Sequence, residues 1–185
     1  MCTAPMATTP VHTHKSQVPP AVIEIKVYTQ RTFNNSCNEE TLMSEKPFVT
    51  GKCLCGDVSY SVSAKPVLTG QCHCKDCQQS SGTGHMSLAF FPKDSVTIKG
   101  DTSSYTAVAD NGAEVTRHFC PNCGSRIYGV NNVLTTIMGI AVGSMDDHSW
   151  FKADRIVYNK RKPEWDFMDE TIPTFEEMPP MPPTK

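Results

Sequence analysis

The stretch F-C-P-N-C-G-S (119–125) decides how this sequence is interpreted. Its C-P-x-C-G form is typical of a zinc knuckle, in which the glycine permits a tight turn and backbone N–H groups point at the thiolates. Two further cysteine clusters precede it, in G-K-C-L-C-G (51–56) and Q-C-H-C-K-D-C-Q (71–78). Seven of the nine cysteines in the 185 residues lie in these three clusters. Because thiolates favour soft metal ions, we expect the fold to be organised by zinc.

The seven clustered cysteines divide into a set of four and a set of three. A structural zinc site is closed by four protein ligands, whereas a catalytic site has three and one open position. The set of four is Cys53, Cys55, Cys120 and Cys123, and the set of three is Cys72, Cys74 and Cys77. Spacing alone leaves another division open, in which His73 or His85 supplies a fourth ligand to the second site and makes it structural as well.

Disulfides and an iron–sulfur cluster are the alternative uses of these cysteines. The first residues, MCTAPMATTPVHTHKSQVPP, lack the apolar segment of a secretory signal, so we expect a cytoplasmic protein in a reducing compartment, where disulfides are rare. The Cys-x-Cys pairs also crowd thiols too closely for ordinary bridges. Iron–sulfur ligation suits thiolates, but the spacings do not match the ferredoxin runs. Cys2 and Cys37 lie outside the clusters, and we interpret them as incidental thiols.

Short segments of alternating polarity surround the clusters and indicate a mainly β fold. In V-S-Y-S-V-S-A (58–64), apolar residues alternate with serines, which is the pattern of a half-buried strand. Further strand candidates are 87–91, 95–100, 114–119, 125–130, 134–142 and 153–159. Only 75–82 resembles a turn of helix. Short strands broken by Gly, Pro and Asn are typical of an all-β domain.

We divide the chain into three parts. Residues 1–47 form an extension that we expect to be mostly disordered, with one strand candidate at 21–30. Residues 48–168 form the zinc-binding domain, and residues 169–185 form a Pro-rich tail that is extended or frayed. The formal net charge is -2, and no apolar run approaches the roughly 20 residues that span a bilayer. We therefore expect neither nucleic acid nor a membrane as a partner.

The cysteine motifs resemble those of the glutathione-dependent formaldehyde-activating enzyme family, also called the centromere protein V/GFA family. The similarity runs from about Val49 to Trp165 and comprises G-x-C-x-C-G, C-H-C-x-x-C-Q-x-x-x-G, F-C-x-x-C-G-S and G-S-M-D-D (143–147). It implies a Mss4-like, or β-tent, fold of zinc-pinned β-sheets. It also implies two zinc ions per chain, a structural one in the four-cysteine set and a catalytic one in the three-cysteine set. The family often has His where this chain has Leu54, so we do not expect a ligand there.

The resemblance implies carbon–sulfur lyase or synthase activity, in which glutathione adds to formaldehyde and gives S-hydroxymethylglutathione. Three thiolates offset most of the charge on zinc, so such a centre suits binding a soft thiolate or polarising a carbonyl oxygen. We predict a zinc-dependent lyase acting on a thiol–aldehyde adduct or a related small molecule, with glutathione as the candidate co-substrate. One alternative is a zinc-dependent tailoring enzyme that acts by elimination or addition on a different small organic substrate. Another is a non-catalytic zinc scaffold. The oligomeric state is left open, with a homodimer as one option.

Residues outside the cysteine clusters supply the remaining candidates. We predict catalytic acid–base roles for His73 and His85, alongside the three cysteines of the open site. The alternatives are a hydrogen bond that supports the ligands for His73 and a surface position for His85. Arg117 and Arg126 are candidates for recognising an anionic substrate such as glutathione, with a solvated strand face as the alternative. We expect structural support from His118, a turn at Asp146 and Asp147, and core packing from Trp150, Phe151 and Trp165.

Overall fold

The computed structural model describes residues 46–179. Within that range no helix has the length and apolar character needed to cross a membrane. The predictions for a disordered extension, a strand at 21–30, and incidental thiols at Cys2 and Cys37 fall outside the described residues.

A small antiparallel sheet contains three strands in the order β1-β2-β5. Its strands are β1 (Val49–Lys52), β2 (Ser59–Val62) and β5 (Val96–Lys99). The alternation noted in the sequence is realised in β2, where Tyr60 and Val62 are buried and the serines between them are half-buried. One face of this sheet therefore faces the core, as the period of two predicts.

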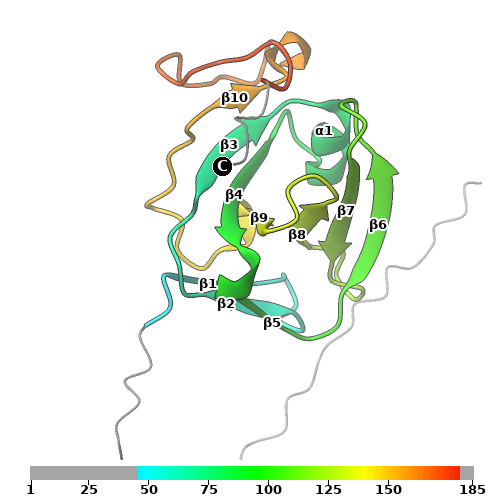
Figure 1. Ribbon diagram of the computed structural model, residues 1–185, viewed down its shortest axis with the longest axis vertical. Helices are drawn as coiled ribbons and strands as arrows, with labels where there is room; N and C mark the ends of the chain where they lie inside the picture. Colours follow the sequence, from blue (N-terminus) through cyan, green and yellow to red (C-terminus); the bar gives the residue numbers. More distant parts are fainter. Residues whose placement is uncertain (1–45, 180–185) are drawn as a thin grey trace, which may run out of the picture. The chain divides into compact units, whose positions relative to one another are not determined.

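A larger sheet contains seven strands in the order β10-β3-β4-β9-β8-β7-β6. Its strands are β3 (Leu68–Cys72), β4 (Met86–Pro92), β6 (Ser103–Val108), β7 (Glu114–Phe119), β8 (Arg126–Asn131), β9 (Ile137–Ala141) and β10 (Ile156–Val157). The pairing is antiparallel except between β10 and β3, which run parallel. Figure 1 shows the sheet curving from β3 round to β6, with α1 (Lys75–Ser81) between β4 and β7. The curve brings β4 and β7 to the same helix although they are not neighbours in the sheet.

The mainly β prediction is confirmed, and the predicted helical turn is present as α1. α1 ends at Gly82, which adopts a left-handed conformation with φ of 71° and donates its N–H to the Gln78 carbonyl at 2.9 Å. Three short 3-10 helices complete the described elements, at Lys93–Ser95, Val142–Ser144 and Asn159–Arg161. The helical content is therefore confined to short connections between strands.

Three strands were not predicted, namely β1, β3 and β6. β3 reads L-T-G-Q-C, in which a glycine and two polar residues hide the alternation. β6 has four exposed residues among its six, so its sequence carries almost no apolar pattern. Both strands are placed by hydrogen bonding to neighbours, β3 to β4 and β6 to β7, rather than by their own composition.

The core lies between the two sheets. One buried cluster contains residues from both sheets. Its members include Val58, Tyr60 and Val62, from β2 and the residue before it, together with Phe91 of β4 and Ile140 of β9. A second, smaller cluster surrounds Cys72 and Cys77 and includes Met86, Val157 and Tyr158. The first cluster joins the sheets, and the second packs around the three-cysteine set.

The segment after residue 168 is extended where it passes β10. Thr174 forms a parallel bridge with Ile156. The Ile156 N–H donates to the Pro173 carbonyl at 2.9 Å, and the Phe175 N–H donates to the Ile156 carbonyl at 2.8 Å. This part of the predicted tail is therefore hydrogen-bonded to the edge of the large sheet.

Candidate metal centres and the adjoining cavity

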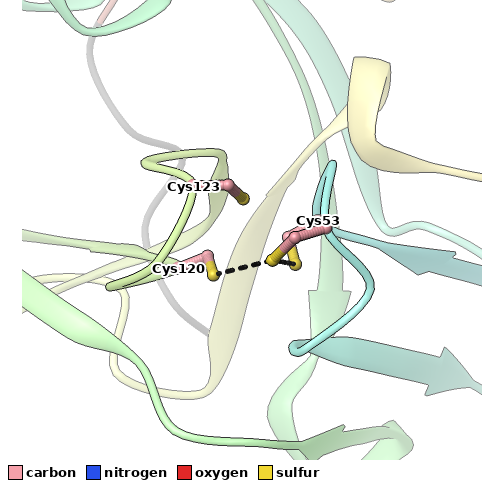
Figure 2. Close-up of side chains that lie close together, drawn as sticks. Cys53, Cys120 and Cys123 are labelled. Carbon is pink, nitrogen blue, oxygen red and sulfur yellow. Dashed lines mark hydrogen bonds between the residues drawn. The ribbon is translucent and has the colours of Figure 1, made fainter. Parts of the chain in front are cut away.

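The set of four cysteines comes from two turns that belong to different sheets. Cys53 and Cys55 lie between β1 and β2, and Cys120 and Cys123 lie between β7 and β8. In Figure 2 the sulfurs of the labelled Cys53, Cys120 and Cys123 converge from the two turns. All four sulfurs lie within 4.8 Å of one another. The cluster therefore connects the β1–β2 turn of the small sheet to the β7–β8 turn of the large sheet.

The local geometry of these turns suits thiolate ligands. Gly56 and Gly124, each following a cysteine, have positive φ values of 87° and 73°. Such values favour glycine, as the knuckle motif predicts. The Val58 N–H donates to Sγ of Cys53 at 3.3 Å, which stabilises negative charge on that sulfur. A hydrogen bond with Ser125 lowers the pKa of Cys123 to about 5.

The donor set fits tetrahedral zinc. Zn–S bonds of about 2.3 Å in a tetrahedron place the sulfurs roughly 3.8 Å apart. Here Sγ of Cys55 lies 3.4 Å from Sγ of Cys53 and 3.6 Å from Sγ of Cys120. The Leu54 side chain is 88% exposed and points away from the ligands as expected, while its N–H donates to Ser125 Oγ at 3.0 Å.

The set of three cysteines surrounds the start of α1. Cys72 ends β3, Cys74 is the N-cap of α1, and Cys77 lies in its first turn. Sγ of Cys74 accepts from the Cys77 N–H at 3.4 Å, and Sγ of Cys72 accepts from the Cys74 N–H at 3.5 Å. These N–H···S contacts also stabilise negative charge on the two sulfurs.

The three thiols are close enough to perturb one another. Hydrogen bonds with Cys72 and Cys77 lower the pKa of Cys74. The hydrogen bond with Cys74 in turn raises the pKa of Cys72. Three thiols this close together suit one metal ion, which binds them as thiolates.

A cavity of about 220 Å³ opens onto all three of these cysteines. It runs along the large sheet, with β3 and β4 on one side and β7 and β8 on the other. Arg117, Arg126 and Tyr158 line it together with the cysteines. The three-cysteine set is therefore next to a space that can admit a small molecule.

The two arginines that the sequence singled out are both in this cavity wall. Arg117 donates from Nη2 to Oδ2 of Asp76 in α1 at 2.7 Å and is largely buried. Arg126 donates from Nη1 to Ser80 Oγ at 2.7 Å, and its buried Nε has no hydrogen-bond partner among the described residues. Neither is a solvated strand-face residue, which was the alternative.

Tyr158 was not singled out by the sequence. It is a non-glycine residue with a left-handed backbone, φ 58°, and it is buried against Cys72 and Cys77. Burial raises the pKa of Tyr158 to about 12, so its phenol stays protonated near neutral pH. A strained conformation beside a candidate metal centre is the kind of signal that only the structure supplies.

His73 and His85 meet at a shared carboxylate instead of the cavity. Oδ2 of Asp166 lies 3.1 Å from Nε2 of His73 and 2.8 Å from Nδ1 of His85. His73 is fully buried, and that burial lowers its pKa, so a neutral ring that donates from Nε2 fits the contact. The described residues that line the cavity include neither histidine, and His85 borders a separate hollow with Lys152 and Phe167. Their catalytic role stays a prediction.

Asp166 was missed by the sequence analysis. It is only 8% exposed, and Gly84 lies so close that a Cβ there would be 2.3 Å from its Oδ2. The three groups also form a third set of potential metal ligands, with donor atoms within 4.8 Å of one another. The only local signal was an aspartate between two aromatic residues in W-D-F-M-D-E, which does not point to the two histidines that it contacts.

The other residues named from the sequence have mostly structural positions. His118 stacks on Tyr128 with ring centroids 4.2 Å apart, and Asp147 accepts from the Ser149 N–H in a turn. Trp150 packs against Phe48 at a centroid distance of 5.1 Å. The prediction that Trp165 closes the core is wrong, because its side chain is 65% exposed at the surface.

Together these features define a class of protein: a mainly β chain with two cysteine clusters that suit zinc, one of which adjoins a cavity. More narrowly, the chain belongs to the glutathione-dependent formaldehyde-activating enzyme family, whose family model matches residues 48–161. The family name is that of an enzyme family. The match confirms the resemblance inferred from the cysteine motifs.

The other comparisons add little. A crystal structure of a Rhodobacter sphaeroides protein is similar at 18% sequence identity and a TM-score of 0.42, covering 52% of this chain and 87% of that chain. A likeness at that level carries no argument about function. No curated protein matches the chain significantly.

Proposed function

We propose that this protein is a zinc-dependent enzyme of the carbon–sulfur lyase or synthase type, which adds a thiol to an aldehyde or cleaves the adduct. The supporting observation is that the three-cysteine set adjoins a cavity of about 220 Å³. The four-cysteine set already supplies a full tetrahedron, so its role is structural. The two sets therefore differ in whether a ligand position is left for a substrate.

Zinc held by Cys72, Cys74 and Cys77 would supply a Lewis acid with one position left for a substrate sulfur or oxygen. When a thiol adds to an aldehyde, an S–C bond forms, the carbonyl π bond opens, and the thiol proton ends on the new hydroxyl oxygen. In this proposal Arg126, which lines the same cavity, donates to that oxygen while it is negative. The neutral Tyr158 phenol offers a second donor in the same wall. Lysis is the reverse.

Glutathione and formaldehyde are the substrates that the family name suggests, and a related small molecule is equally compatible with the reaction type. In this proposal the protein carries one zinc ion in each cysteine set and acts in the cytoplasm, because thiolate ligands need a reducing compartment. A tailoring reaction on a different organic substrate is favoured by one observation, the apolar character of part of the cavity wall.

The test compares the wild-type chain with Cys74→Ser and, as a matched control, Cys37→Ser outside the clusters. Zinc content is measured by elemental analysis. Turnover is measured by NMR with formaldehyde and two thiols, glutathione and benzyl mercaptan. We expect two zinc ions per wild-type chain, one in Cys74→Ser with turnover reduced to background, and no change in Cys37→Ser.

Two outcomes would contradict the proposal. One is a single zinc ion in the wild type that Cys74→Ser retains. The other is the absence of rate enhancement with both thiols in fully zinc-loaded protein.

A further inference from the structure

The cavity beside the three cysteines has two chemically different ends. Near the cysteines it is lined by Arg117 and Arg126. Away from them it is lined by Leu68 and Phe90, which face each other in the β3–β4 register. Leu88, opposite Gly70, lies between that pair and the cysteines and packs against the Cys72 and Cys77 cluster. Val130 of β8, with Leu134 after it, closes the apolar end from the opposite side. A molecule that reaches the cysteines must therefore place part of itself against an apolar wall.

Two paired glycines shape the floor of this cavity. Gly129 of β8 and Gly139 of β9 are register partners, and both line the cavity. A Cβ on Gly139 would lie 2.8 Å from Cε1 of Phe90, so the ring occupies the space that a side chain there would need. A Cβ on Gly129 would lie 3.2 Å from Nη2 of Arg126, so the Phe90 ring and the Arg126 guanidinium cover the two glycines. An aromatic ring and a guanidinium plane in the same wall suit a planar anionic group.

The carboxylates and the guanidinium groups in the cavity wall differ in whether they have partners. Two carboxylates line the cavity, and both are ion-paired, Asp76 with Arg117 and Asp110 with Arg161. By contrast, the buried Nε atoms of Arg126 and Arg155 lack hydrogen-bond partners among the described residues. In the described wall, both carboxylates therefore have a cationic partner, whereas two guanidinium groups each keep one nitrogen without a partner.

We infer that the substrate is a small, mostly apolar molecule with a planar ring and one anionic group, such as a carboxylate or phenolate, rather than glutathione. The inference rests on the proposed function for the reaction that this cavity serves. Glutathione carries an ammonium group, for which no unpaired carboxylate is present in the described wall. It also has no large apolar part to cover Leu88 and Phe90, so binding it would leave polar groups against an apolar surface.

The experiment measures binding of 2-naphthoate and of glutathione to the zinc-loaded full chain by isothermal titration calorimetry. 2-Naphthoate has a planar apolar ring and one carboxylate. We expect it to bind at least about 10-fold more tightly than glutathione, since burying the ring against apolar side chains is favourable. Leu88→Asn and Leu134→Asn should each weaken naphthoate binding about 10-fold.

Val67→Asn is the matched control, because Val67 is exposed, precedes the cavity-lining Leu68 and is not in the wall. It should leave naphthoate binding unchanged. Arg126→Gln should weaken naphthoate but leave binding of uncharged 2-naphthalenemethanol within about twofold. Zinc content and melting temperature of each variant separate loss of binding from loss of folding.

Glutathione binding as tight as naphthoate would overturn the inference. So would undetectable naphthoate binding, or the same naphthoate affinity in Leu88→Asn and Leu134→Asn as in the wild type. Naphthoate has neither a thiol nor an aldehyde, so its binding is independent of the proposed reaction. Tight naphthoate binding without turnover of any thiol would contradict the proposed function alone, whereas tight glutathione binding with turnover would contradict the ligand class alone.

Discussion

Asp166 is the residue whose position changes the interpretation of the site most. Its Oδ2 contacts both His73, which lies between two of the clustered cysteines, and His85. His73 sits in the same short segment as Cys72 and Cys74, so the carboxylate fixes the backbone from which those thiols project. We therefore assign Asp166 a positioning role toward the three-cysteine site, in the way that outer hydrogen bonds orient metal ligands.

Asp166→Asn is expected to weaken zinc binding at the three-cysteine site by about 10–100-fold, because a neutral amide oxygen is a weaker acceptor for both histidines than the carboxylate oxygen. It is also expected to lower the free energy of unfolding by about 1–3 kcal/mol. Chelator competition measures the zinc affinity, and urea denaturation measures the stability. Asp94→Asn, at an exposed position, is the control.

Gly84→Ala is expected to disturb the same contacts between Asp166 and the two histidines, because Gly84 lies against the Asp166 carboxylate. Its Cβ would lie 2.3 Å from Oδ2 of Asp166, whereas a Cβ on Gly143 meets nothing within 4 Å, so Gly143→Ala is its control. Both changes act on the same carboxylate. The double variant Gly84→Ala/Asp166→Asn should therefore bind zinc no more weakly than the weaker-binding single variant. Zinc affinity in Asp166→Asn equal to that of Asp94→Asn would exclude the positioning role.

At the scale of elements, the turns between strands are what the cysteine motifs specify. The β1–β2 and β7–β8 turns each carry two thiols, and each has a glycine in the left-handed region. Their sulfurs meet although Cys55 and Cys120 are 65 residues apart in the chain. A metal ion here would therefore link two hairpins of different sheets, between which the described residues form no backbone-to-backbone hydrogen bond.

Cys120→Ser is expected to release the zinc of the four-cysteine site and to lower the melting temperature more than Cys74→Ser does. The physical reason is that the first variant separates two hairpins, whereas the second disturbs one local segment. Calorimetry and zinc analysis on both variants check this. If Cys120→Ser fails to fold, stepwise chelation of zinc from the wild type takes its place. Unfolding is then expected to coincide with loss of the more tightly bound zinc ion. Equal melting temperatures for the two variants would contradict the assignment.

Strand prediction succeeded where the sequence carries several apolar residues at regular spacing and failed in β1, β3 and β6, where it does not. The candidate at 114–119 coincides with β7, and those at 58–64 and 95–100 contain β2 and β5. β6 has mostly exposed side chains, and its place in the sheet depends on pairing with β7. β1 and β3 reach the core through Val49 and Cys72, but these few buried positions are not enough to form a pattern in the sequence.

At the scale of the molecule, the chain beyond residue 168 contributes to the large sheet. Pro173 and Phe175 hydrogen-bond to Ile156 of β10, and Asn159 donates to the Phe175 carbonyl at 3.0 Å. Met178 and Pro179 then reach the cavity wall. A domain boundary at 168, as drawn from the sequence, would separate these contacts from the sheet that they stabilise.

Truncation after residue 168 is expected to lower the free energy of unfolding, with each lost backbone hydrogen bond contributing about 0.5–1.5 kcal/mol. It should also weaken binding in the cavity, because Met178 and Pro179 are removed. Urea denaturation and the naphthoate titration measure the two effects. Truncation after residue 179, which keeps every described residue, is the control, and equal stability of the two truncated chains would contradict the expectation.

The sequence by itself determined the two cysteine sets that could hold metal, the mainly β class, the family and most strand positions. These follow from residue chemistry and from spacing over a few residues, which are local properties. Only the tertiary structure decided that Arg126 and Tyr158 line the cavity and that His73 and His85 share Asp166, 93 and 81 residues away. The reason is physical: such meetings depend on sheet register and curvature, which are fixed by long-range pairing and leave no periodic trace in the residues that meet.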